Sequence, residues 1–89
     1  MLVLPAEITN QQARAAAATL QQGMHALDGS EVVLDASAMV KFDSSALAVL
    51  LQCRREALQS GKSFEVRGTS SRLRDLATLY GIEGLLQLA

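Results

Sequence analysis

The feature that most constrains the fold is the alternation of short strand-like runs with longer segments of helical apolar spacing. The strand-like runs occupy residues 2–4, 32–34 and 63–67. The helical segments that follow them cover residues 13–27, 44–58 and 73–80. Strands that alternate with helices favour parallel strands joined by helical crossovers. The sequence therefore predicts a small α/β fold, with a mostly parallel or mixed sheet and helices packed against it.

The same patterns predict which side chains face the core. Residues 32–34 are all apolar, without alternation, which is typical of a central strand covered on both faces. Leu58 continues the core stripe of the second helix, and Tyr80 continues that of the third. Thr9 and Gln12 have the spacing of a capping box, which places the start of the first helix at Thr9.

Composition and residue inventory narrow the classes of function. The chain of 89 residues predicts one domain spanning residues 1–89. A net charge of −1 with scattered basic residues predicts no nucleic-acid binding. His25 has no companion ligands and Cys53 lies in an apolar helix pattern, so we expect no metal, no cofactor and a core cysteine. No nucleotide-binding glycine motif is present and no convincing catalytic triad can be written, so we expect no enzyme activity.

The first residues of the chain and the length of its apolar segments indicate where in the cell the protein is located. Residues 1–5 lack the basic region and the long apolar stretch of a signal peptide. No window approaches the roughly 18–20 apolar residues needed to span a bilayer. The sequence predicts a cytoplasmic protein with no direct membrane insertion.

The most informative motif is Asp43-Ser44-Ser45, at the start of the second helix. The first turn of a helix has unpaired backbone N–H groups and partial positive charge. Asp43 is therefore predicted to cap this helix. The two serines could support the cap, meet a partner's polar groups or hold a phosphate, and local composition leaves these alternatives open.

Residues 32–35, then 42–47 and the leucine-rich helix, resemble the central signature of the STAS domain. That family includes anti-sigma-factor antagonists, transporter-associated domains and MlaB, a small cytoplasmic subunit of bacterial phospholipid-transport ABC systems. Residues 76–82 look more like MlaB, where a Leu-Tyr pair precedes the final turn. Ala46 departs from the glycine that antagonists commonly carry there.

The resemblance implies a mixed sheet with packed helices, and it implies that the first strand of the family is missing here. A partner or a second copy could then occupy the sheet edge. The apolar tail, Leu85, Leu86 and Leu88, is expected either to pack internally or to form a homodimer contact.

The MlaB-like resemblance implies a non-catalytic accessory subunit that binds the ATPase of an ABC transporter, held through this partner at the inner face of the inner membrane. It implies that Ser44 contacts the ATPase. The antagonist relatives imply the alternative, a switch phosphorylated at Ser45 that binds an anti-sigma factor or kinase. The residues expected to bind the partner are Met39, Val40, Lys41, Ser44, Ser45, Thr69, Ser70, Ser71 and Leu73.

Overall fold

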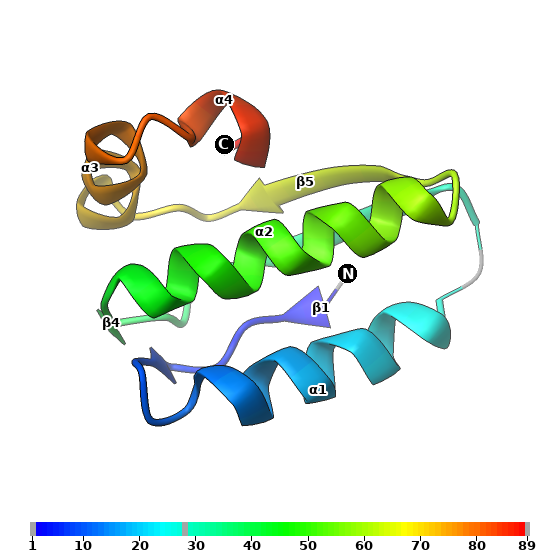
Figure 1. The fold of residues 1–89 in the computed structure, drawn as a ribbon, viewed down its shortest axis with the longest axis horizontal. Helices are drawn as coiled ribbons and strands as arrows, with labels where there is room; N and C mark the ends of the chain where they lie inside the picture. Colours follow the sequence, from blue (N-terminus) through cyan, green and yellow to red (C-terminus); the bar gives the residue numbers. More distant parts are fainter. Residues whose placement is uncertain (1, 28, 89) are drawn as a thin grey trace.

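The structure is a computed structural model that describes residues 2–27 and 29–88, and it is organised around one central strand, β3. Parallel pairing joins β3 to β1 on one side and to β5 on the other, and β2 pairs in parallel with β4 (Figure 1). The strands are β1 (Leu2–Val3), β2 (Glu7–Ile8), β3 (Glu31–Asp35), β4 (Lys41–Phe42) and β5 (Ser63–Arg67). The helices are α1 (Ala13–His25), α2 (Ser44–Gln59), α3 (Ser71–Leu79) and α4 (Glu83–Leu86). The predicted α/β class is confirmed.

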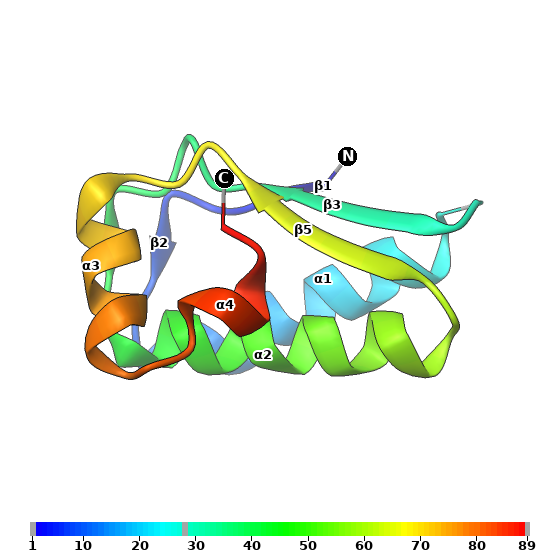
Figure 2. The ribbon, with the colours of Figure 1, turned by 90° about the horizontal axis from the view of Figure 1, so that it is seen from above.

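Helices α1 and α2 lie side by side on one face of the three-stranded sheet (Figure 2). The strand order β1-β3-β5 advances in a single direction, so right-handed crossovers place both helices on the same face. Along β3, Val32 and Leu34 are buried, whereas Val33 points to the other face and is only half-buried. The prediction that this strand is covered on both faces is therefore wrong.

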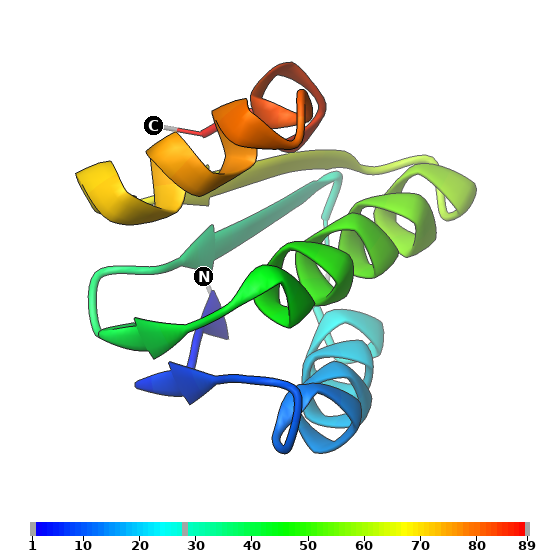
Figure 3. The same cartoon turned by 60° about the vertical axis from the view of Figure 1, so that its left-hand side comes forward.

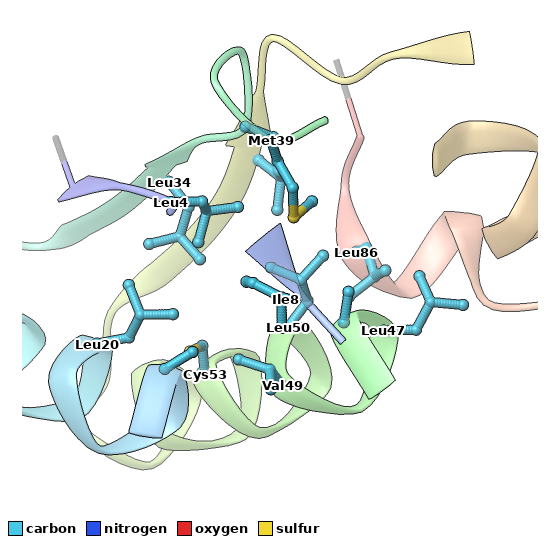
Figure 4. Packing of buried hydrophobic residues seen from close by; sticks show 14 of the residues in the cluster. Leu4, Ile8, Leu20, Leu34, Met39, Leu47, Val49, Leu50, Cys53 and Leu86 are labelled. Carbon is cyan, nitrogen blue, oxygen red and sulfur yellow. The ribbon is translucent and has the colours of Figure 1, made fainter. Parts of the chain in front are cut away.

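The hydrophobic core lies between the sheet and the helices, and it is built mainly from aliphatic side chains and alanines (Figure 4). The small side chains of Ala16 and Ala17 form part of the buried face of α1, which packs against α2. The fully buried larger side chains are Leu4, Ile8, Val32, Leu34, Leu50, Cys53, Val66, Leu73 and Leu86. Cys53 is thus a core residue, as predicted.

Two predicted core residues are exposed. Leu58 is 49% exposed because it lies at the edge of the buried face of α2. This edge is buried at Leu47 but becomes accessible to solvent toward the end of the helix. Tyr80 is 56% exposed because α3 ends at Leu79. The chain then turns at Gly81, and Leu86 of α4 is buried in the core instead.

Helix α1 begins at Ala13, as its apolar spacing predicts, and not at Thr9, where the capping-box pattern placed its start. The backbone N–H of Thr9 donates to Gln12 Oε1 at 2.9 Å, as a capping box requires. However, the backbone N–H groups of Gln12 and Ala13 both donate to the Thr9 carbonyl, and α1 begins at Ala13. Residues 9–12 therefore form a turn, which is preceded by the two-residue strand β2 that the sequence did not predict.

The last described residues cover the outer edge of β5. After α4, Leu88 forms a parallel bridge with Val66, and the Val66 N–H donates to the Gln87 carbonyl at 3.3 Å. Leu86 is buried and Leu88 is partly buried against the core, whereas Leu85 is exposed. Most of the apolar tail therefore packs internally. We predict that other family members have an additional strand before β1 and that this chain lacks it, and this stays a prediction.

Candidate partner-binding face

Two loops and two helix starts meet at one end of the molecule, on the left in Figure 1 and turned forward in Figure 3. Strands β3 and β5 are parallel, so their carboxyl ends lie at the same edge of the sheet. The chain leaves this edge toward α2 and α3. Residues 39–45 and 69–73, which together we call the candidate face, contain all the partner-binding residues predicted from the sequence.

Asp43 caps α2, as predicted. Its Oδ1 accepts a hydrogen bond from the Ser45 backbone N–H at 2.8 Å, and its Oδ2 accepts one from the Asn10 N–H at 3.1 Å. The Ser45 backbone N–H is the main reason that the pKa of Asp43 lies below its ordinary value of 3.8, and the Asn10 N–H lowers it further. One carboxylate therefore holds the start of α2 to the turn that precedes α1.

The two serines after Asp43 have different surroundings. Ser44 is exposed, whereas Ser45 is half-buried. Ser45 lines a shallow groove of about 480 Å³ between α1 and α2, together with small side chains such as Ala17 and Ala48. Ser44 is therefore the more accessible hydroxyl. Ala46, the departure from the antagonist pattern, is fully buried.

The turn before α3 uses one of its three hydroxyls for capping. Ser70 Oγ accepts a hydrogen bond from the Leu73 N–H at 3.2 Å, which makes Ser70 the N-cap of α3. Ser71 is exposed at the first helical position. The Thr69 hydroxyl is buried and has no hydrogen-bond partner among the described residues. Of these three residues, Ser71 offers the accessible hydroxyl that is not already engaged as the cap of α3.

Met39 and Leu73, predicted as partner-binding residues, are corrected by the structure because both side chains are buried in the core. The Met39 N–H donates to the Ala36 carbonyl, which turns the loop inward, and Figure 4 shows the Met39 side chain pointing into the core. Leu73 belongs to the buried stripe of α3. The exposed apolar side chain of this loop is Val40, at 68% exposure.

A close contact that sequence reasoning missed joins the two loops. Asp35 Oδ1 accepts from the Ser37 N–H at 2.9 Å, and hydrogen bonds from the Ser37 side chain and backbone lower the pKa of Asp35. Gly68 passes against this turn with a φ of +70°, and a Cβ there would lie 2.9 Å from Ser37 Cβ. The Ala36 N–H donates to the Arg67 carbonyl at 2.7 Å. An aspartate two residues before a serine is a recognisable turn signal, but its partner Gly68 is not apparent from sequence.

A second missed contact lies between β4 and α3. The guanidinium carbon of Arg72 lies 5.2 Å from the centroid of the Phe42 ring, which is within cation–π range. Phe42 is half-buried against the core, and Arg72 is exposed. The contact connects the start of α3 to the strand that leads into α2.

The side chains of residues 2–27 and 29–88 provide neither a metal-binding cluster nor a reactive thiol. No group of three or more His, Cys, Asp or Glu side chains among residues 2–27 and 29–88 could hold a metal ion. Burial, with a smaller effect from Glu56, raises the pKa of Cys53 to about 11, so its thiol stays protonated near neutral pH. This end of the molecule carries an exposed valine, accessible hydroxyls and cations, and hydrogen bonds hold its loops in place.

Comparison with known proteins agrees with the fold. A family model described as "Mlab, STAS domain" matches residues 1–87. No curated protein matches the chain significantly. The family match covers nearly the whole chain, including both loops of the candidate face. The chain therefore belongs to the STAS domain family and is MlaB-like.

Proposed function

We propose that this protein is a non-catalytic accessory subunit that binds the ATPase of a phospholipid-transport ABC system, which maintains lipid asymmetry of the outer membrane. The observation that carries the proposal is the MlaB family match over residues 1–87. STAS domains are generally non-catalytic, which supports an accessory role. On this proposal the protein is cytoplasmic and reaches the inner membrane through its partner.

The candidate face has the composition expected of a docking surface. Val40 supplies exposed apolar area, and three further exposed residues of the candidate face, Lys41, Ser44 and Ser71, are polar. An apolar centre with a polar rim is the usual anatomy of a protein interface. Because the loops are braced by Asp35 and Asp43, little conformational entropy would be lost on binding. The protein would thereby offer the ATPase a preformed surface that favours its productive arrangement.

None of the helices in the described part of the chain combines the length and the apolar character that crossing a membrane requires.

Ser44→Ala tests the proposal. We expect the variant to bind the cognate ATPase about tenfold more weakly, because a hydrogen bond at an interface contributes about 1–1.5 kcal/mol. Binding is measured by titrating the purified ATPase, and thermal unfolding checks that the fold is intact. Ser60→Ala is the matched control, since Ser60 is an exposed serine at the opposite end of α2. Equal affinity of Ser44→Ala and wild type would contradict the proposed contact.

The alternative is an anti-sigma-factor antagonist switched by phosphorylation of Ser45. Its support is the hydroxyl at the start of α2, where the helix dipole favours a phosphate. Against it, Ser45 is half-buried and its backbone N–H already donates to Asp43, whose carboxylate would repel a phosphate. Intact-mass measurement of protein from native cells, with and without the cognate kinase, distinguishes the two functions. Phosphate on Ser45 would favour the antagonist.

A further inference from the structure

We propose that Arg72, stacked on the Phe42 ring, binds a carboxylate of the partner, so that the docking surface on the ATPase carries an Asp or Glu opposite the start of α3. This inference rests on the proposed function, because it takes the ATPase as the partner. It adds the chemistry that the partner must present and assigns a role to a residue outside the serine motif.

The stacked arrangement prepares the guanidinium for a planar acceptor. The ring of Phe42 is fixed because it packs partly against the core, and Arg72 lies 5.2 Å from its centroid. Stacking restrains a long side chain that would otherwise lose rotamer freedom on binding. The guanidinium has five N–H donors in its plane, so those that do not point at the ring can meet a carboxylate in a bidentate geometry.

These donors have no acceptor in the described part of the chain. The ion pair present among residues 2–27 and 29–88 joins Arg67 to Glu65, and no side-chain hydrogen bond there involves the Arg72 guanidinium. Asp75, one turn further along α3, is not within ion-pair distance of Arg72. The guanidinium can therefore take a carboxylate from outside without breaking an existing pair.

The stability of α3 does not explain an arginine at this position. Arg72 is the second residue of the helix, and the first turn of α3 has no acidic residue. A cation there opposes the helix dipole, whereas an acid would be favourable. An exposed cation–π contact is of about the same size as this cost, so the two roughly cancel and leave no net gain for the helix. A role in recognition accounts for the placement better than helix stability does.

The charge balance of the candidate face also favours an acidic partner. Its charged residues are Lys41, Asp43 and Arg72. Both carboxylate oxygens of Asp43 accept backbone hydrogen bonds, and Lys41 lies directly opposite Glu7 in the β2–β4 pair. Neither Lys41 nor Arg72 forms an ion pair among the described residues, so the candidate face has two exposed cations and one carboxylate that is engaged in capping. A surface of this kind matches a carboxylate on the partner.

The experiment titrates the purified ATPase with wild type, Arg72→Gln and Arg72→Lys, each at low and at high salt. We expect Arg72→Gln to weaken binding by about tenfold or more and to lose most of the salt dependence. Arg72→Lys keeps the charge but loses the planar fork, so we expect an affinity between the two. Arg74→Gln is the control, because it removes the same charge from an exposed position two residues further along α3. Its affinity should stay within about twofold of wild type.

Each outcome of this experiment bears on the inference. Wild-type affinity of Arg72→Gln, or equal losses in the Arg72→Gln and Arg74→Gln variants, would overturn the specific role of Arg72. Full affinity of Arg72→Lys would overturn the stacked-fork geometry. If the wild-type protein binds no ATPase, the proposed function fails and the inference fails with it. Thermal unfolding of each variant separates loss of fold from loss of contact.

Discussion

Helices α2 and α3 both begin at the candidate face, but their first turns are capped by different chemistry. Asp43 caps α2 with a charged side chain that also accepts the Asn10 N–H from another loop. Ser70 caps α3 with a neutral hydroxyl that bonds only within its own turn. The start of α2 is thus tied to the rest of the fold by its cap, whereas the start of α3 depends on neighbouring contacts.

Those neighbouring contacts are the close approach at Gly68 and the stacking of Arg72 on Phe42. The first joins the α3 loop to the turn at Ser37, and the second joins α3 to β4. Asp43 alone connects the start of α2 to the rest of the fold, whereas two separate contacts connect the start of α3. This difference predicts how strongly each helix start responds to substitution.

Gly68→Ala should have the largest effect on stability. The residue has a φ of +70°, and its new Cβ would lie 2.9 Å from Ser37 Cβ and 3.0 Å from Asp35 Oδ1. Backbone strain and crowding together should cost about 2–4 kcal/mol. Urea unfolding measures this loss. Gly61→Ala is the control, because it has a similar φ of +74° but nothing within 4 Å of the added Cβ. Equal losses in both variants would show that strain alone matters and that the contact does not.

Asp43→Ala should destabilise the protein more than Ser70→Ala. The first change removes acceptors for two N–H groups on different loops, and the second removes an acceptor for one. Loss of an N-cap serine costs about 0.5–2 kcal/mol. Hydrogen exchange should speed up at Asn10 and Ser45 in Asp43→Ala, but only at Leu73 in Ser70→Ala. If the Asn10 amide kept its protection in Asp43→Ala, the link between the two loops would be absent.

Acid should weaken the cap of α2 but not that of α3. The pKa of Asp43 is lower in the folded protein than its ordinary value of 3.8, so its contribution is fully present above that value. The contribution is lost as the pH falls through the folded pKa. The stability difference between wild type and Asp43→Asn should therefore shrink on acidification below about pH 4. The difference between wild type and Ser70→Ala should stay constant, because a hydroxyl does not titrate in this range.

The alternation of the longer strands and helices and the cap at Asp43 could be predicted from sequence because both depend on local patterns, whereas the short elements β2, β4 and α4 were missed. Apolar periodicity located β3, β5 and the three longer helices α1, α2 and α3, but not the short helix α4. An aspartate before a helical segment is a strong cap signal. The open face of β3 could not be predicted in this way. Residues 32–34 are all apolar, and only the direction of the strand order decides that Val33 faces away from the helices.

The candidate face could be predicted only in outline. The sequence placed Met39 and Leu73 on it because they are neighbours of polar turns, but side-chain direction depends on tertiary packing and buries both. The contacts of Gly68 and Arg72 join residues about thirty positions apart in the chain. No local pattern identifies such pairs, so sequence reasoning missed the residues that brace the start of α3.

Ser44→Ala and Ser71→Ala should have the smallest effect on stability. Both serines are exposed at the first position of their helices, and neither side chain is the cap. Each change should alter the free energy of unfolding by less than about 0.5 kcal/mol in urea unfolding. A loss above about 1 kcal/mol in either variant would show that this serine helps to cap its helix. The capping role would then not belong to Asp43 or Ser70 alone. With stability unchanged, any loss of ATPase binding in these variants would reflect the lost hydroxyl itself, because the caps that hold α2 and α3 would still be in place.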